Sequence, residues 1–337
     1  MKLRTFNGLT GIGPSSKEVT VDTYSSYQDS SPVVPRIVVI GNFDGLHRGH
    51  LALLDKANQL ATSKSAALTV LTFSPHPVQV LAPHRAPRPL MSDLEKASAF
   101  KRLGVETVWF QTFTKEFAEL SPQDFVKYVL QDGLGAVHVV VGYDFHFGRG
   151  RAGNVETLGR LLSQVQIGLS VIQPVEESEH KISSSAIRKA LSEGELERAH
   201  HLLGWSYAIT GQVLRGDARG RTISFPTLNI ALSDQQYPLP GVYSGWVPID
   251  GQYLPAVANL GPRPTVENSE RLTLEVHVIG TALGEMYGQD VEFIFASKVR
   301  EVIRFDGIDA LKAQIKLDAA KALTHLEGRM PNRLRLA

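Results

Sequence analysis

Two histidines three residues apart, in a glycine-rich segment, are the side chains of this sequence best suited to chemistry on a phosphate. His47 and His50 belong to the segment GNFDGLHRGH, which follows the apolar run 37–40 and precedes a helical pattern from about Leu51. The start of a helix presents unpaired N–H groups and a partial positive charge, which favour phosphate. Imidazoles beside it stabilise charge that develops when a phosphorus centre is attacked. The segment predicts a nucleotide-handling turn, in which the backbone approaches its ligand closely at Gly41, Gly45 and Gly49.

Two other interpretations of the histidine pair are open. The pair is half of a metal site in the first, but the chain has no cysteine and no obvious third ligand nearby. In the second, a surface turn carries two histidines without a function. We favour the phosphate interpretation, because it uses the glycines, the preceding strand and the helix start together.

Length, charge and composition limit the remaining possibilities. A chain of 337 residues is long enough for two domains, and 43% hydrophobic with 20% charged residues is typical of globular proteins. A net charge of +1 gives no electrostatic footprint for nucleic acid or a membrane. No apolar run suits a membrane span or a signal peptide. The absence of cysteine agrees with a reducing cytoplasm. We expect small-molecule partners and a monomer or a weak homo-oligomer.

The order of elements predicts an α/β domain followed by a small barrel. Buried strands alternate with helices, which predicts a doubly wound parallel sheet covered on both faces. The expected strands are 37–40, 67–73, 107–110, 137–141 and 169–172, and the expected helices are 51–62, 92–103, 121–131 and 154–162. Residues 22–35, rich in Ser, Tyr and Pro, are expected to form a flexible surface insertion.

The second half of the chain has a different pattern. Two short helices, 183–190 and 195–203, lead to short strands with dense Gly and Pro turns. That pattern predicts a small antiparallel barrel. Its expected strands are 208–214, 241–248, 272–279 and 290–296. A last helix from about 308 to 326 has one apolar stripe, formed by Ile308, Leu311, Ile315, Ala319, Ala322 and Leu326.

A hydroxyl-rich segment late in the first domain is the second candidate phosphate element. In KISSSAIR, residues 181–188, Ser184 and Ser185 open a helix and Arg188 follows one turn later, where it can grip phosphate oxygens. Serines that only cap a helix are the alternative. Together with the His-x-Gly-His segment, this one resembles the nucleotidylyltransferase superfamily, whose pattern is HxGH followed by ISSTxxR. Ser185 stands here for the usual threonine and keeps the hydroxyl.

More of the first domain resembles one member of that superfamily. SPHP at residues 74–77 and GYDFHFG at 142–148 are similar to the adenylyltransferase half of bacterial bifunctional riboflavin kinase/FAD synthetases. A rigid proline-bounded loop and a strand-end turn are the alternatives for these two segments. The resemblance implies that Phe43 and Asp44 help to bind ATP, and that His76 and Asp144 contact the flavin or the nucleotide.

The start of the barrel domain resembles the riboflavin kinase signature GxxxGRxIGFPTAN. Residues 216–229 read GDARGRTISFPTLN, with Ser224 and Leu228 where the family usually has Gly and Ala. The resemblance implies a loop that folds over ATP phosphates, with Gly216, Gly220 and Arg221 as binding residues. Thr227 and Asn229 would supply oxygen ligands to Mg²⁺ and contact the nucleotide. A hairpin without a ligand is the alternative.

The alternating strand LTLEVHV, residues 272–278, holds the candidate base. Leu272, Leu274, Val276 and Val278 take one face, and Thr273, Glu275 and His277 take the other. A glutamate on a polar face can accept the proton of a flavin hydroxyl as it attacks ATP. On pattern alone, such a glutamate is more often a solvated surface residue. The resemblance implies the catalytic role for Glu275, and it places Arg300 and Glu301 at the flavin.

The resemblance covers nearly the whole chain except residues 17–35. It implies an FMN adenylyltransferase domain over residues 1–188, a helical linker over 189–204 and a riboflavin kinase barrel over 205–337. ATP would convert riboflavin to FMN in the barrel and FMN to FAD in the first domain, with Mg²⁺ in both. His47 and His50 would act at the α-phosphate, where the FMN phosphate needs no strong base.

Three alternative hypotheses explain part of these sequence motifs. In one, only one domain is active, because the changes at Ser224 and Leu228 weaken the kinase. In another, the chain binds or delivers flavin without turnover. In the third, the first domain acts on a different phosphate substrate such as phosphopantetheine, which leaves the barrel unexplained.

Overall fold

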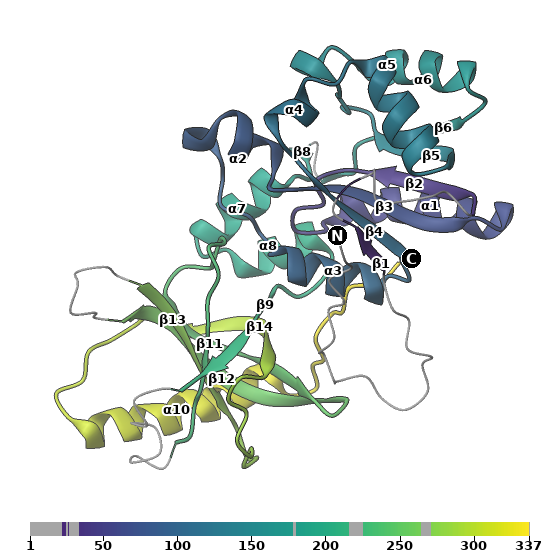
Figure 1. The fold of residues 1–337 in the computed structure, drawn as a ribbon. Helices are drawn as coiled ribbons and strands as arrows, with labels where there is room; N and C mark the ends of the chain where they lie inside the picture. The colour runs from purple at the N-terminus through teal and green to yellow at the C-terminus, as the bar shows by residue number, and fades with distance from the viewer. Residues whose placement is uncertain are drawn as a thin grey trace. The chain divides into compact units, whose positions relative to one another are not determined.

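The chain divides into two compact units that are described separately (Figure 1). The computed structural model describes residues 22–24, 26, 34–177, 180–215, 225–263 and 271–336. Among these residues, the first unit runs from Asp22 to Ser184 and includes residues 334–336, and the second runs from Ser185 to Arg333.

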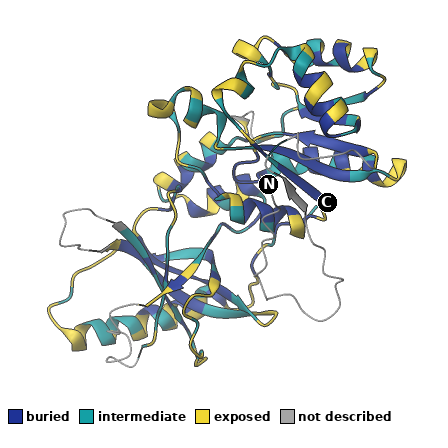
Figure 2. Ribbon diagram, viewed as in Figure 1, coloured by how far each residue is buried: buried dark blue, intermediate teal, exposed yellow. Residues whose placement is uncertain are grey.

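The first unit is built on a six-stranded sheet in which every paired strand is parallel. The strand order across the sheet is β1-β4-β3-β2-β5-β6. Its strands are β1 (Asp22–Tyr24), β2 (Arg36–Ile40), β3 (Ala67–Ser74), β4 (Thr107–Thr112), β5 (Ala136–Gly142) and β6 (Gly168–Ile172). The central strands are almost continuously buried, as Figure 2 shows, which explains their unbroken apolar sequences.

Helices cover both faces of this sheet. A π-helix, η3 (Phe125–Gly133), and α6 (Val155–Gln164) share one core with alternating residues of β2 and β5, among them Val38 and Val139. The helix α1 (Arg48–Lys64) packs on the other face against β2, β3 and β5. Local sequence fixes the helix starts. Ser92 and Glu95 form a reciprocal capping box at α3 (Asp93–Arg102).

Smaller elements complete the first unit. They are α2 (Pro77–Leu81), η2 (Pro83–Arg85), α4 (Lys115–Ala118), α5 (Pro122–Asp124), η4 (Arg149–Arg151), β7 (Glu176–Glu177) and β8 (His180–Lys181). The last two pair as a short antiparallel ribbon.

The strand order reverses between β2 and β5, at whose carboxyl ends open α/β sheets bind their ligands. The two strands are neighbours, yet β2 leads through α1 to β3 on one side, whereas β5 leads through α6 to β6 on the other. Such a reversal of strand order leaves a crevice in which ligands of open α/β sheets bind. The segments 41–50 and 142–148, singled out in the sequence, lie at the ends of these two strands.

The predicted elements of the first unit are confirmed, with two corrections. The expected surface insertion is wrong at Asp22–Tyr24, which form the edge strand β1 beside β4. Two of its three residues are polar, so no apolar run indicated a strand. Most of the remainder of 22–35 lies outside the described residues. The expected helix 121–131 is divided into α5 and the π-helix η3.

The second unit begins at Ser185, the second residue of α7 (Ser184–Ser192), and continues through α8 (Leu196–Leu203) into a closed barrel. Around the barrel the order is β10-β13-β12-β11-β14-β9, and all pairs are antiparallel. The strands are β9 (Ala208–Leu214), β10 (Leu228–Ile230), β11 (Gly241–Ile249), β12 (Gln252–Arg263), β13 (Arg271–Val278) and β14 (Asp290–Arg300).

The barrel interior is apolar, and a helix covers part of its outer wall. Phe295 packs edge-on against Tyr243 and Phe293, with ring centroids 5.2 and 4.8 Å apart. The helix α10 (Ile308–Leu326) packs on the outside of β11, β12 and β14, where Ala322 joins a cluster with Val242. The outer wall over β10 and β13 carries polar residues instead.

The barrel prediction is confirmed, although two strands were not predicted. The strand β12 was missed because Pro255 and Pro262 lie within it, and proline lacks the N–H that a strand ladder uses. The strand β10 is only three residues long. The predicted stripe of α10 is correct at Ala322 and Leu326, which are buried, and wrong at Ile308, which is 61% exposed.

Candidate active sites

The turn of residues 41–50 connects β2 to α1 and aims the first turn of that helix. Phe43, Gly45 and Leu46 all have positive φ angles, so the backbone folds tightly before the helix begins. The helix starts at Arg48, three residues earlier than predicted, and His47 is its N-cap. His50 is therefore the third helical residue, and both predicted histidines lie at the amino end of α1.

The two histidine rings are stacked, with centroids 3.7 Å apart and planes inclined by 16°. The backbone N–H of His50 donates to Nδ1 of His47 at 3.3 Å. A nitrogen that accepts a hydrogen bond carries no proton, so the neutral His47 ring has its proton on Nε2. The Nε2–H group is thus a donor available to a ligand. Nδ1 of His50 is buried without a hydrogen-bond partner among the described residues.

Burial keeps both imidazoles neutral. Burial, helped by the nearby Lys181 ammonium, lowers the pKa of His47 to about 4, against a smaller opposing effect of the backbone hydrogen bond. Burial also lowers the pKa of His50 well below its ordinary value, with contributions from His47, Lys96 and Lys181. A neutral histidine donates to a phosphate oxygen without a permanent charge.

Asp44 holds the turn in shape. Its carboxylate, which is buried, accepts the backbone N–H of Leu90 through Oδ1 at 2.7 Å. Its carbonyl oxygen accepts the Ser184 hydroxyl at 2.8 Å. The two contacts join the turn to segments 46 and 140 residues away in the chain. The structure thus brings together one serine of the 181–188 segment and the histidine turn.

The rest of the 181–188 segment continues along α7. Ser184 and Ser185 open this helix, and Arg188 follows one turn later, as the sequence predicted. Ser184 ends the first unit, whereas Ser185 and Arg188 belong to the second. Their position relative to His47 stays a prediction.

The segment after β5 contributes an ion pair at the strand-reversal point. Asp144 pairs with Lys181, and the Lys181 ammonium also lies 4.8 Å from the centroid of the Tyr143 ring. Burial works to lower the pKa of Lys181, but Asp144 and Tyr143 outweigh it and raise that pKa. Lys181 therefore stays charged, and sequence reasoning gave it no role.

In the segment after β3, the histidine predicted to bind a ligand caps a short helix. The Ser74–Pro75 peptide bond is cis, and the Ser74 hydroxyl donates to Asp93. His76 caps α2, because its Nδ1 accepts the backbone N–H of Val78 at 3.2 Å. A contact between His76 and a flavin or nucleotide stays a prediction.

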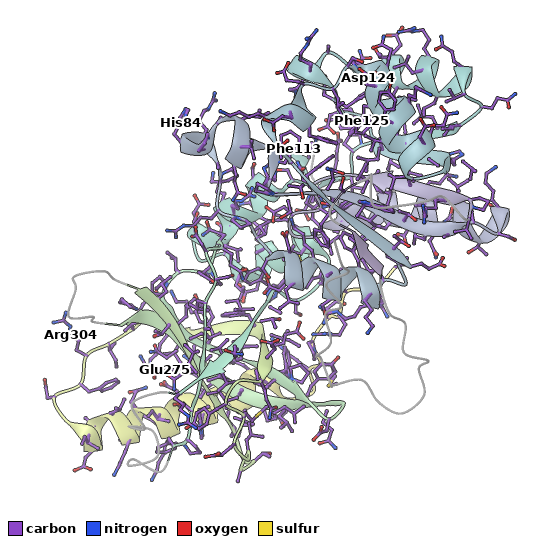
Figure 3. The ribbon with its side chains drawn as sticks, in the orientation of Figure 1. His84, Phe113, Asp124, Phe125, Glu275 and Arg304 are labelled. Carbon is purple, nitrogen blue, oxygen red and sulfur yellow. The ribbon has the colours of Figure 1, made fainter. Side chains whose placement is uncertain are left out.

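In the barrel, the candidate base lies in a row of paired residues on the outer wall. Glu275 of β13 is directly opposite Asn229 of β10 on one side and Asn259 of β12 on the other. Asn259 is paired in turn with Val242 of β11, and Val242 with Arg300 of β14. Paired residues of antiparallel strands point to the same face, so these five side chains share the outer wall. Figure 3 labels Glu275 among these strands.

The alternation along β13 is as the sequence predicted. Leu274, Val276 and Val278 are buried, whereas Glu275 and His277 are half-buried on the opposite face. His277 Nδ1 donates to the carbonyl of Pro226 at 3.0 Å. This contact fixes the segment that leads into β10. Asn259 and His277 are residues of this polar wall that sequence reasoning left without a role.

The kinase signature is described only in part. Thr227 is half-buried, directly before β10, and Asn229 lies two residues later on that strand. Leu228, one of the two departures from the family pattern, is paired with Val276. Gly216, Gly220, Arg221 and Ser224 lie outside the described residues.

Arg300 is held by a carboxylate of α10. Its Nε and Nη2 donate to both oxygens of the buried Asp318 at 2.7–3.0 Å, and its Nη1 donates to the carbonyl of Glu301. The Glu301 side chain is exposed and accepts from Lys298. Three adjacent-strand steps separate Glu275 from Arg300, or about 14 Å along the wall at the usual strand spacing.

Among the described residues, no cluster of three or more His, Cys, Asp or Glu side chains is arranged to hold a metal ion. None of the helices in the described ranges combines the length and the apolar character that a membrane crossing requires.

The fold and the family matches together define a two-unit transferase, with an α/β unit followed by an antiparallel barrel. Two family models match in the same order: FAD synthetase over residues 31–186 and riboflavin kinase over residues 203–326. The chain belongs to the bifunctional riboflavin kinase/FMN adenylyltransferase family.

Individual relatives agree with the family models. Bifunctional riboflavin kinase/FMN adenylyltransferases of Pseudomonas fluorescens and Escherichia coli K12 are each 38% identical to this chain, over 85% of it and 91% of their own length. That of Bacillus subtilis is 36% identical over 86% and 92%. A crystal structure titled macrolide-efflux protein from Streptococcus pneumoniae is similar as well, with 31% identity, a TM-score of 0.78 and coverage of 89% of this chain and 97% of that one.

Proposed function

We propose that this chain phosphorylates riboflavin to FMN in the barrel unit and adenylylates FMN to FAD in the α/β unit, with ATP as the donor in both reactions. Family membership with matching order of the two family models supports both activities. The observation that carries the assignment to residues is the neutral, stacked His47–His50 pair at the amino end of α1, beside the strand-reversal point of the sheet.

In the α/β unit, an FMN phosphate oxygen attacks the α-phosphorus of ATP. A new P–O bond forms, the bond from the α-phosphorus to the bridging oxygen breaks, and pyrophosphate leaves with the bonding electrons. His47 donates its Nε2–H to an α-phosphate oxygen as negative charge develops there, and His50 lies beside it. The phosphate of FMN is already ionised at neutral pH, so this step requires no general base.

The other proposed residues of this site hold the reactants. The turn backbone and Ser184 border the phosphates, while Lys181 and Asp144 border the flavin phosphate or the nucleotide. The full proposed binding set is Gly41, Phe43, Asp44, Gly45, Gly49, His76, Asp144, Ser184, Ser185 and Arg188. Of these, Asp44 acts through the shape of the turn, because its carboxylate accepts from Leu90.

In the barrel unit, the terminal ribityl hydroxyl of riboflavin attacks the γ-phosphorus of ATP. The Glu275 carboxylate accepts the hydroxyl proton as the new O–P bond forms, and ADP leaves. An alcohol has a high pKa, so a carboxylate that receives its proton is useful here. Gly216, Gly220 and Arg221 are proposed for the phosphates, and Arg300 and Glu301 for the flavin.

Thr227 and Asn229 fit a magnesium ion by their chemistry. A hydroxyl and an amide carbonyl are hard oxygen ligands, and Mg²⁺ takes few protein ligands when phosphates and water fill its other positions. Bound there, the ion would neutralise charge on the nucleotide phosphates. The proposal of Mg²⁺ rests on these residue types and on their place two residues apart at the start of β10.

We further propose a cytoplasmic enzyme that is a monomer or a weak homo-oligomer. The lack of cysteine supports a reducing compartment. The boundaries 1–188, 189–204 and 205–337 remain our proposal for the two catalytic domains and their linker. Size-exclusion chromatography with light scattering tests the oligomeric state.

One experiment tests the two activities separately. Purified chain is incubated with ATP and Mg²⁺ and with either riboflavin or FMN, and the flavins are separated by chromatography. We expect FMN and FAD from riboflavin, and FAD from FMN. If the tube with FMN yields FAD and the tube with riboflavin yields no product, only the first unit is active. Bound but unconverted flavin in both tubes would favour a delivery protein.

A further inference from the structure

A lysine that belongs to none of the sequence motifs lies almost completely buried on α3. Lys96 is 4% exposed, and its ammonium forms an ion pair with Asp93, Nζ to Oδ1, at 3.6 Å. The Asp93 side chain is 48% exposed and also accepts the Ser74 hydroxyl. Buried lysines normally have close, well-shielded partners, because an ammonium is costly to remove from water. A long contact to an exposed, shared carboxylate is a weak partner for this charge.

The face of α3 that carries Lys96 packs against the histidine turn. Lys96 and Phe100 are four residues apart, so they lie on the same face of the helix. The Phe100 ring meets the Phe43 ring edge-on at 5.4 Å, and Phe43 meets the His50 ring at 5.3 Å. Lys96 is therefore one helical turn from this contact. The effect of its charge on the pKa of His50, which burial and His47 also lower, agrees with that position.

A second ammonium approaches the same histidines from another segment. Lys181 acts on both His47 and His50, and its partner Asp144 has a side chain that is 56% exposed. The buried carboxylate of Asp44 in the turn is engaged by a backbone N–H. The ammonium groups of Lys96 and Lys181 thus both act on His50, while the side chains of their partners Asp93 and Asp144 are about half exposed. This arrangement is complementary to a chain of phosphates.

We propose that Lys96 binds the phosphate chain of ATP in the adenylyltransferase site and that Asp93 holds its ammonium when no nucleotide is bound. The inference rests on the proposed function of the first unit. The Lys96 ammonium contributes a charge-assisted hydrogen bond to a phosphate oxygen, and it stabilises the negative charge that pyrophosphate gains as the α-phosphorus bond breaks.

The test compares Lys96→Met with the unaltered full-length chain. Lys96→Met keeps an unbranched apolar stem in the buried position and removes the charge. We expect the Kd for magnesium pyrophosphate, measured by calorimetry, and the KM for ATP with FMN supplied, to rise roughly 10- to 100-fold. FMN formation from riboflavin in the barrel unit should stay unchanged. Lys96→Arg, which retains the charge, should recover most of the pyrophosphate affinity.

Lys101→Met is the matched control, because Lys101 is an exposed lysine of the same helix. The Lys101→Met protein should bind pyrophosphate with the same affinity as the unaltered chain. A folded Lys96→Met protein with unchanged pyrophosphate affinity and unchanged KM would overturn the proposal and leave Lys96 a structural residue.

Two further outcomes are covered. If Lys96→Met does not fold, the lysine ammonium resonances of the unaltered protein decide. The Lys96 resonance is identified as the one that is missing from the spectrum of Lys96→Arg. In the unaltered protein this resonance should shift when magnesium pyrophosphate is added, and a resonance that does not shift would refute the inference. If the unaltered chain makes no FAD from FMN, the proposed function has failed, and pyrophosphate binding still tests Lys96 by itself.

Discussion

Asn229 and Glu275 are directly opposite each other on adjacent antiparallel strands of the barrel. Their separation is fixed by the hydrogen-bonded register of β10 and β13 and depends little on side-chain choice elsewhere. A proposed metal ligand and a proposed base are thereby held side by side on a rigid wall. Asn259 flanks Glu275 on the other side, so the carboxylate lies between two amides.

Replacing the proposed base tests this arrangement. Glu275→Gln keeps the shape of the side chain but cannot accept a proton, so kcat for FMN formation should fall about 10²- to 10⁴-fold. Adenylylation of supplied FMN provides the internal control and should not change. A Glu275→Gln enzyme with the original kinase turnover would exclude Glu275 as the base.

His47 has two tasks that a pair of substitutions can separate. His47→Ala removes both the helix cap and the imidazole, and loss of a cap costs about 0.5–2 kcal/mol. His47→Asn should retain the cap and lose only the Nε2–H donor. We expect both variants to lose FAD formation by about 10²-fold or more. Chemical denaturation should show a loss of stability for His47→Ala but not for His47→Asn. Full activity of a stable His47→Asn protein would contradict the proposed role.

The depressed pKa of His47 predicts how stability depends on pH. The folded state binds a proton only below about pH 4, whereas the unfolded chain does so below about 6.5. Stability should therefore be constant above pH 6.5 and fall as the pH drops toward 4. At pH 5 this histidine should cost about 2 kcal/mol relative to pH 7.

Two measurements check this pH dependence. Titration of histidine C–H resonances should give a pKa near 4 for His47, and urea unfolding at pH 7 and 5 should show the loss. His200, whose pKa burial lowers to about 4 in the second unit, should add a similar dependence there. The His47→Asn variant is the control, since it cannot titrate. A His47 that titrates near 6.5 would contradict the proposed burial effect.

Two substitutions of Asp44 test its hydrogen bond with the backbone N–H of Leu90: one removes the accepting oxygen and the other keeps it. Asp44→Ala leaves the N–H of Leu90 without its 2.7 Å partner, so the first unit should lose about 1–3 kcal/mol. Asp44→Asn retains the carbonyl oxygen and should retain most of the stability. Thermal melting measures both variants. Equal destabilisation by the two changes would mean that the negative charge, and not the acceptor, matters.

The Arg300–Asp318 pair should stabilise the barrel unit. Asp318→Ala leaves a guanidinium that is only 20% exposed without its bidentate partner, which should cost about 2–4 kcal/mol. Glu301→Gln is the matched control. It removes an ion pair whose carboxylate is 76% exposed, so its effect should stay below about 1 kcal/mol. Similar losses of stability in the two variants would show that the burial of the Arg300–Asp318 pair does not determine its contribution.

The sequence predicted what depends on local pattern. The turn of residues 41–50 was recognisable because its glycines, its histidines and the preceding apolar strand are contiguous, and the strand alternation around Glu275 was visible for the same reason. The strand β12 was not predicted, since Pro255 and Pro262 contradict a strand locally while the closed barrel overrides them.

The features that sequence reasoning missed depend on distant segments. Lys96 looks like any helical lysine, and only the packing of α3 against Phe43 reveals that it is buried beside the histidines. The pairing of Asn259 with Glu275 requires the register of β12 and β13. Long-range packing and register are set by the whole fold, which a single sequence does not display.

Helix α7 has a consequence for anyone who separates the two halves of this enzyme. Its first residue, Ser184, is anchored to the Asp44 carbonyl of the first unit, but the residues that follow belong to the second. Cutting the chain between Ser184 and Ser185 would leave a frayed end against the turn of residues 41–50. Isolated halves should therefore overlap, each carrying its own copy of Ser184–Ser192.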